Sequence, residues 1–245
     1  MSKFFVKESQ IKENICTIIG DDVKHISRVL RMKEKEELQV CNEETGESYI
    51  AEIAQVLENE IKCKIIRKVE VTTEPNVNIT LFQGIPKFEK MELIIQKNTE
   101  LGVKKFVPVM MERTVVKLDS KSMQKKLQRW QKISETAAKQ SMRDMIPQVK
   151  EVVKLKDIDF SEYDKILVAY ENEENNMLKT ELNNIKDENR IYNIAVVIGP
   201  EGGISEKEIE ILKQKDASFV SLGKRILRTE TAGIVICGNI MYELD

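Results

Sequence analysis

The strongest limit on the possible folds is a regular alternation of strand-like and helix-like patterns from Val77 to the C-terminus. Short apolar runs are typical of buried strands, and between them lie longer stretches with helical periodicity. We expect strands at residues 77–85, 105–110, 165–169, 192–198 and 218–222, and helices at 87–101, 120–142, 177–185, 205–214 and 229–244. This order predicts an α/β domain with a largely parallel sheet, which binds ligands at the carboxyl ends of its strands.

The N-terminal part of the chain has a different pattern, with short strands separated by turn residues. Strands are expected at residues 4–7, 15–19, 37–41, 49–56 and 61–69, with one short helix at 21–30. This pattern predicts a small β-barrel. The polar stretch 71–76 contains Pro75 and is the best linker candidate. We therefore expect an N-terminal domain over residues 1–72 and a C-terminal domain over residues 73–245.

Two glycine-bearing loops each follow a predicted strand and open a predicted helix. The first is IGPEGGIS at 198–205, and the second is LGKRILRTETA at 222–232. Glycines allow the backbone to approach a ligand closely. The first loop alone fits a structural turn equally well, because Ser205 and Glu208 form a capping box for the next helix. The polar string 228–231, set between apolar elements, is not required by packing, so the two loops together predict one ligand pocket.

Several classes of site are excluded by the residues present. Neither G-x-G-x-x-G nor G-x-x-x-x-G-K-[ST] occurs, which disfavours a dinucleotide fold and a P-loop. His25 is the only histidine, and the four cysteines include no Cys-x-x-Cys pair, so we predict no metal site and expect buried thiols at Cys16, Cys41, Cys63 and Cys237. No apolar run approaches the roughly 20 residues of a membrane span, and the N-terminus lacks the apolar stretch of a signal peptide. We therefore expect a cytoplasmic protein.

The overall charge limits how the chain could contact nucleic acid. A net charge of −2 argues against coating nucleic acid by bulk electrostatics. Basic side chains nevertheless gather on the predicted helix between Lys121 and Arg143. A solvated helix face remains the more frequent explanation for any one of these lysines.

The two loops resemble the RsmE family of ribosomal RNA methyltransferases, which belongs to the knotted SPOUT superfamily. The resemblance extends in order to residues 25–32, 83–103, 112–120, 127–149 and 169–171. It implies an N-terminal PUA-like β-barrel that binds RNA and a C-terminal domain with a deep trefoil knot, which dimerises through its knot helices. It also implies transfer of a methyl group from S-adenosylmethionine to N3 of one uridine in 16S ribosomal RNA of the small ribosomal subunit.

By the same resemblance, the loops surround the cofactor. The implied cofactor-binding residues are Ala169, Tyr170, Ile198, Gly199, Pro200, Gly202, Gly203, Leu222, Gly223, Ile226, Leu227 and Thr229. Uridine N3 becomes nucleophilic only as its proton leaves, so Arg228 is the candidate stabiliser of the developing anion. Glu201 or Glu230 could accept the proton or orient Arg228. Alternatively, Arg228 pairs with Glu230 or with a dimer partner, and Glu201 holds its loop by accepting backbone N–H bonds.

RNA contacts are expected on both domains. The candidate phosphate ligands are Arg28 and Arg31 on the barrel and Lys87, Lys90, Arg113 and Arg143 on the catalytic domain. Lys3 departs from the family pattern, which has arginine before the Phe-Phe pair, so its role as a specific RNA contact is weakened. Two other readings stay open: a non-catalytic ribosome-assembly factor, and a methyltransferase acting on ribose 2′-OH or on transfer RNA.

Overall fold

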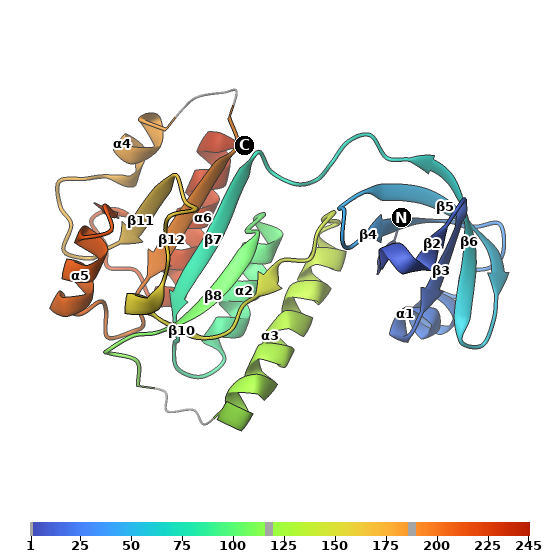
Figure 1. Cartoon of the computed structure of the whole chain (residues 1–245), viewed down its shortest axis with the longest axis horizontal. Helices are drawn as coiled ribbons and strands as arrows, with labels where there is room; N and C mark the ends of the chain where they lie inside the picture. Colours follow the sequence, from blue (N-terminus) through green and yellow to red (C-terminus); the bar gives the residue numbers. More distant parts are fainter. Residues whose placement is uncertain (1, 116–119, 186–189) are drawn as a thin grey trace. The chain divides into compact units, whose positions relative to one another are not determined.

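The computed structural model describes residues 2–115, 120–185 and 190–245, so part of the expected segment 112–120 lies outside the described residues. The chain forms two compact units, each with its own sheet (Figure 1). The first unit comprises Met1–Glu74 and Ala138–Ile146, and the second comprises Pro75–Ala137 and Pro147–Asp245. The boundary between residues 72 and 73 stays a prediction. No pattern in the sequence indicates that residues 138–146 belong with the N-terminal residues.

The first unit is built on a curled six-stranded sheet with the order β1-β4-β5-β6-β3-β2. Its strands are β1 (Lys3–Val6), β2 (Ile11–Lys12), β3 (Ile15–Ile19), β4 (Glu37–Asn42), β5 (Ser48–Val56) and β6 (Glu60–Lys68). The pairing of β1 with β4 is parallel, and the other pairings are antiparallel. Two irregularities in the register between β5 and β6 lie after Ile50 and Ile53. Such irregularities bend a strand, which suits a curled sheet.

Short helical segments complete the first unit: η1 (Glu8–Gln10), α1 (Asp21–Lys24) and η2 (His25–Val29). The helix expected at residues 21–30 is therefore split, because η2 is a π-helical turn. Val23 and Ile26 point inward to a core that includes Phe4, Ile18 and Leu38. Arg28 and Arg31 are exposed on and just after η2, so both expected phosphate ligands face solvent.

A buried ion pair connects the two stretches of chain that make up the first unit. Lys3 Nζ lies 2.7 Å from Asp144 Oδ1 and donates to the carbonyl of Met142 at 2.6 Å. The side chains of Lys3 and Asp144 are 0% and 3% exposed. The Thr73 N–H also donates to Asp144 Oδ2, at 2.7 Å. Lys3 thus stabilises this unit from inside, and its ammonium group does not face solvent.

Arg143 requires a correction. It was expected on the catalytic domain as a phosphate ligand, but it lies in the first unit and is only 3% exposed. Its guanidinium pairs with the Glu74 carboxylate, which also accepts the Asp144 N–H at 2.9 Å. Arg143 therefore serves the packing of the first unit, because its donors face a carboxylate inside the protein.

The second unit contains a parallel sheet, as predicted, with the strand order β10-β8-β7-β12-β11-β13 and a short strand β9 beside β8. The strands are β7 (Val77–Gly84), β8 (Lys105–Met110), β9 (Gln148–Val149), β10 (Val153–Lys154), β11 (Lys165–Ala169), β12 (Tyr192–Ile198) and β13 (Ser218–Val220). The helices are α2 (Lys90–Glu100), α3 (Ser120–Gln140), η3 (Leu155–Asp157), α4 (Leu178–Asn183), α5 (Glu206–Lys213) and α6 (Thr229–Leu244). Among the described residues, no helix combines the length and apolar character of a membrane span.

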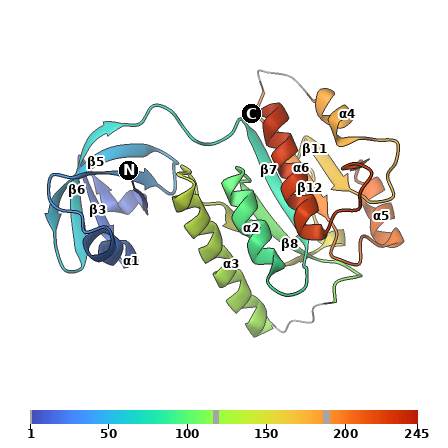
Figure 2. The same cartoon turned by 180° about the vertical axis from the view of Figure 1, so that it is seen from behind.

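Helices cover both faces of this sheet. Successive residues of a strand point to opposite faces, so one strand contributes side chains to both cores. In β12, Ile194 and Val196 join the core formed with α2 and α6, whereas Ala195 and Val197 join the core that contains α5. Figure 2 shows α2 and α6 in front of the sheet. The near-continuous apolar character of β12 thus follows from burial on both faces.

Candidate active site

Three loops meet at the carboxyl edge of the parallel sheet. They follow β11, β12 and β13, and β11 lies between the other two strands. Two adjoining hollows of about 90 and 340 Å³ open here. The smaller is lined by Ala169, Tyr170, Glu171, Ser221, Leu222, Gly223, Lys224, Arg225, Ile226, Leu227 and Ala232. The larger is lined by Lys90, Ala169, Glu171, Ile198, Gly199, Pro200, Glu201, Gly203, Ile226, Leu227, Arg228, Thr229 and Ala232.

The structure therefore brings together the residues that the sequence assigned to one pocket. Of the twelve expected cofactor residues, Gly202 alone is not part of the lining of either hollow. It packs instead against Arg113, because a Cβ at Gly202 would lie 2.9 Å from Arg113 Cβ. Arg113 also donates from Nη1 to the Gly202 carbonyl at 2.9 Å. Arg113, expected to bind phosphate, thus also braces the first glycine loop.

The first glycine loop is a tight turn that leaves no room for added side chains. The Gly203 N–H donates to the Pro200 carbonyl at 2.9 Å, and Gly203 has a φ of +71°. A Cβ at Gly203 would lie 2.6 Å from Glu171 Oε1. On the opposite side, a Cβ at Gly84 would lie 2.6 Å from the Pro200 nitrogen. The loop is therefore held between the ends of two strands, with its backbone at the wall of the larger hollow.

The capping box predicted after this loop is present at the start of α5. The Ser205 side chain accepts the Glu208 N–H at 3.4 Å, and Glu208 Oε2 accepts the Ser205 N–H at 3.0 Å. The other carboxylate oxygen of Glu208 accepts the Glu112 N–H at 2.8 Å. The first loop is thus a structural turn and a pocket wall at the same time, so its two alternative readings are compatible.

A chain of two buried hydrogen bonds connects the first glycine loop to the start of α6. Gln83 Nε2 donates to Thr229 Oγ1 at 2.9 Å, and Thr229 Oγ1 donates to the Gly199 carbonyl at 2.6 Å. Gln83 lies at the end of β7 and is fully buried. Arg228, immediately before Thr229, is exposed and lines the larger hollow. The position of Arg228 relative to the glycine loop is therefore fixed by Thr229.

Lys90 lies at the centre of the charged groups beside the larger hollow. Its Nζ lies 2.9 Å from Glu201 Oε1 and 3.3 Å from Glu230 Oε2. The hydrogen bond to Glu201 raises the pKa of Lys90. Lys90, which was expected to bind RNA phosphate, thus shares its ammonium group between two carboxylates of the protein.

The same contacts distinguish between the roles left open for the two glutamates. Burial alone would raise the pKa of Glu201, but hydrogen bonds from Lys90 and the Lys87 N–H outweigh burial and lower that pKa. A carboxylate with a lowered pKa is a weaker base, so these contacts favour a role for Glu201 in holding its loop. Glu230 pairs with Lys90, and within the described residues no ion pair joins Glu230 to Arg228.

Three charged side chains in the lining were not predicted as site residues. Glu171 lines both hollows, and Lys224 and Arg225 line the smaller one. All three lie inside segments that resemble the family. A charged residue type does not by itself distinguish a site residue from a charge that faces solvent. In the described parts of the chain, no group of histidine, cysteine or acidic residues has the arrangement of a metal site. The four cysteines are buried and free, as expected.

Comparisons with known proteins cover nearly the whole chain. A family model described as an RNA methyltransferase domain matches residues 73–241, and one described as an RNA methyltransferase PUA domain matches residues 18–66. Ribosomal RNA small subunit methyltransferase E of Bacillus subtilis is 35% identical, with 100% of this chain and 98% of the relative covered. The protein of the same name from Aquifex aeolicus is 33% identical, with 98% and 99% covered.

Solved structures with bound cofactor are also similar. A putative methyltransferase from Legionella pneumophila in complex with S-adenosylmethionine has a TM-score of 0.83 and 29% identity, with 98% of this chain and 96% of that one covered. Ribosomal RNA small subunit methyltransferase E from Neisseria gonorrhoeae, bound to S-adenosylmethionine, has a TM-score of 0.83 and 28% identity, with 99% and 97% covered.

Proposed function

Because the chain belongs to the RNA methyltransferase family that includes ribosomal RNA small subunit methyltransferase E, we propose that it transfers a methyl group from S-adenosylmethionine to N3 of one uridine in 16S ribosomal RNA. The observation that carries this proposal is the joint lining of two adjoining hollows by the loops after β11, β12 and β13. Relatives that share the fold bind S-adenosylmethionine, and relatives with more than 30% identity are named for the small-subunit RNA.

The residues around the hollows fit S-adenosylmethionine. Leu222, Ile226 and Leu227 offer apolar surface for the adenine, and the glycine loop offers backbone groups at close range. A Cβ at Gly223 would meet nothing within 4 Å, so the smaller hollow stays open there. Glu171 places a carboxylate at both hollows, which suits a ligand with hydroxyl and ammonium groups.

In the mechanism that we propose, the bound cofactor supplies an electrophilic methyl group, and the residues of the chain prepare the nucleophile. Uridine N3 gives up its proton to bulk water as the bond to the methyl carbon forms, so negative charge develops on the neighbouring carbonyl oxygens. Arg228 stabilises that charge with a permanently charged guanidinium. Glu201 and Glu230 hold Lys90 and thereby fix the glycine loop and the first turn of α6 around the base.

Thr229 gives a direct test of how the two loops are joined. We expect Thr229→Val to lower the free energy of unfolding by about 1–3 kcal/mol, because the Gly199 carbonyl and the Gln83 amide lose their shared partner while buried. The affinity for S-adenosylmethionine should fall as well. Urea unfolding and calorimetric titration would measure both quantities. Thr229→Ser keeps the hydroxyl and should remain near wild type; equal losses in the two variants would contradict this role.

The proposal includes the remaining family features. The trefoil knot is supported by the strand order, in which the last strand, β13, adds beside β11 before the chain returns to form α6. A homodimer through α6 is supported by Tyr242, which is 86% exposed on that helix. The first unit would bind RNA through Arg28 and Arg31, and the second unit through Lys87 and Arg113. The protein would act on the small ribosomal subunit in the cytoplasm.

The decisive experiment is transfer of labelled methyl from S-adenosylmethionine to purified small ribosomal subunits that lack the modification, followed by nucleoside identification by mass spectrometry. Label in N3-methyluridine is the expected result. Label in a 2′-O-methylated nucleoside, or in transfer RNA offered in parallel, would move the reaction to another target. Cofactor binding without any product would favour the assembly-factor reading.

A further inference from the structure

Phe88 has an apolar side chain that is exposed to solvent beside the larger hollow. Its side chain is 84% exposed, and it lies in the connection between β7 and α2. Its φ is +57°, a left-handed backbone conformation that is unfavourable for a bulky residue other than glycine. Strained positions of this kind cluster at binding sites. The packing of the second unit does not explain the ring, because the ring contributes almost nothing to either core.

The backbone around Phe88 is anchored to the site on both sides. The N–H of Lys87 donates to Glu201 Oε1 at 3.1 Å, and Lys90 pairs with Glu201 and Glu230. Glu201 and Lys90 both line the larger hollow. Phe88, which lies between these two contacts in the sequence, is therefore fixed at the rim of the hollow.

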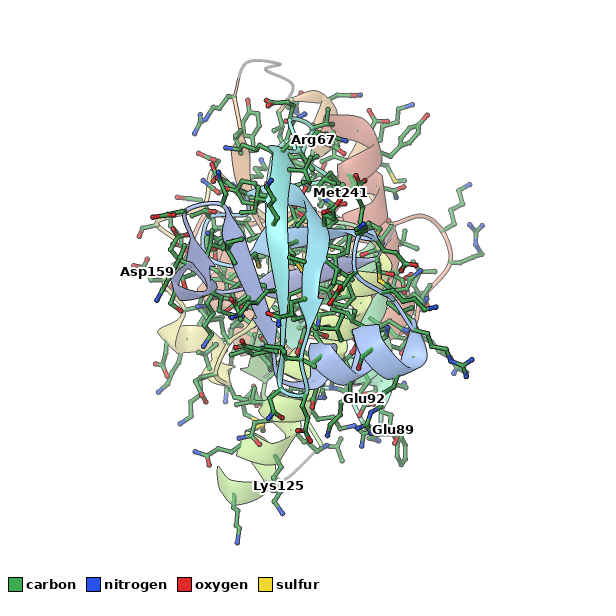
Figure 3. All side chains as sticks on the ribbon, turned by 90° about the vertical axis from the view of Figure 1, so that its right-hand side faces the viewer. Arg67, Glu89, Glu92, Lys125, Asp159 and Met241 are labelled. Atoms are coloured by element: carbon green, nitrogen blue, oxygen red, sulfur yellow. The ribbon has the colours of Figure 1, made fainter. Side chains whose placement is uncertain are left out.

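The charge around this rim suits a polyanion. Lys87, next to Phe88, and Arg228, in the lining of the larger hollow, have no ion pair with any described residue. The same is true of Lys224 and Arg225, which line the adjoining smaller hollow. Arg129 Nη2 lies 2.8 Å from Glu92 and 3.6 Å from Glu89, so one guanidinium offsets part of the negative charge of these two carboxylates. Figure 3 shows Glu89 and Glu92 close together. An exposed aromatic ring among cations is the arrangement that proteins use to hold unpaired nucleotides.

We propose that Phe88 is a stacking platform for an RNA base next to the target uridine. This inference rests on the proposed function. An enzyme that acts on the edge of a base must take the base out of its stack, and neighbouring bases then lose a stacking partner. The Phe88 ring offers a replacement partner at the rim, so it would hold the opened RNA while the uridine occupies the hollow.

Two substitutions separate stacking from simple apolar contact. Phe88→Leu keeps an apolar side chain without an aromatic face, and we expect its KM for small ribosomal subunits to rise about 5- to 150-fold. Its affinity for S-adenosylmethionine should stay at the wild-type value. Phe88→Trp should keep wild-type KM, and subunits should quench the fluorescence of the added indole. The wild type, whose Trp130 is only 3% exposed, provides the background fluorescence. Ile191→Ala is the matched control, because Ile191 is 59% exposed but precedes β12, at the opposite end of that strand from the site.

The outcomes distinguish this inference from the proposed function. If the wild type transfers no methyl group, the proposed function fails. If the wild type is active and Phe88→Leu has an unchanged KM, the stacking role alone is wrong. A changed oligomeric state in Phe88→Leu, measured by light scattering together with unchanged RNA affinity, would assign the ring to contact with a second copy of the chain. Loss of cofactor affinity would assign it to the pocket wall; either result would overturn the inference.

Discussion

Arg228→Ala is expected to lower kcat for methyl transfer by about 100- to 1,000-fold while leaving the fold and the affinity for S-adenosylmethionine nearly unchanged. The reduction follows because the proposed stabilising charge acts only as the uridine anion develops, so its loss raises the barrier without weakening ground-state binding. The fold should survive because Arg228 is exposed and its side chain makes no capping hydrogen bond to α6. Single-turnover methylation of small ribosomal subunits, with cofactor affinity measured by calorimetry, would check both parts.

Arg225→Ala is the matched control for this experiment. Arg225 is also exposed and lines the neighbouring hollow, but it lies three residues before the start of the polar string that opens α6. We expect it to raise KM for RNA without a large change in kcat. Arg228→Lys should recover part of the activity, because it keeps the charge and loses the planar geometry of the guanidinium. Near-normal turnover of Arg228→Ala would remove Arg228 from the mechanism.

The parallel sheet could be predicted from the sequence because its central strands are buried on both faces. The bounds predicted for β8, β11, β12 and α6 agree with the structure, since each begins or ends where an apolar run meets a charged residue or a glycine. The short strands β2, β9 and β10 were not predicted. Each has only two residues, so it is defined by pairing with a neighbour and not by a pattern of its own.

The loops that form the candidate site could be predicted from the sequence, but the partners of its charged side chains could not. Glycines and apolar residues marked the two loops, and the strand order brought these loops together. Lys90 was assigned to phosphate, yet it pairs with Glu201 and Glu230 from two other segments. Arg143 was misplaced for the same reason: its partner, Glu74, is distant in sequence. A sequence shows where charges occur along the chain, whereas their pairing depends on contacts that only the fold creates.

Asp144→Asn is expected to destabilise the protein by about 3–5 kcal/mol, because it leaves the Lys3 ammonium buried without its counter-ion. Burial alone would raise the pKa of Asp144, but hydrogen bonds from Lys3, Ser48 and the Thr73 N–H outweigh burial and lower that pKa. The native state therefore binds a proton to Asp144 less readily than the unfolded state does. The resulting stability is present above the unfolded-state pKa of about 3.9, and it is lost as the pH falls through the lower folded-state value.

Denaturant unfolding at several pH values tests both consequences. The wild type should lose stability steeply on the acid side, and Asp144→Asn should show a shallower loss there because residue 144 no longer titrates. Adding Lys3→Met to Asp144→Asn should restore part of the lost stability, since the unpaired ammonium is then removed. Glu60→Gln is the control: Glu60 pairs with Lys62 at 3.4 Å with both side chains exposed, so the change should be below about 1 kcal/mol. If Asp144→Asn cost no more than Glu60→Gln, the Lys3–Asp144 pair would not be what joins residues 138–146 to the N-terminal strands.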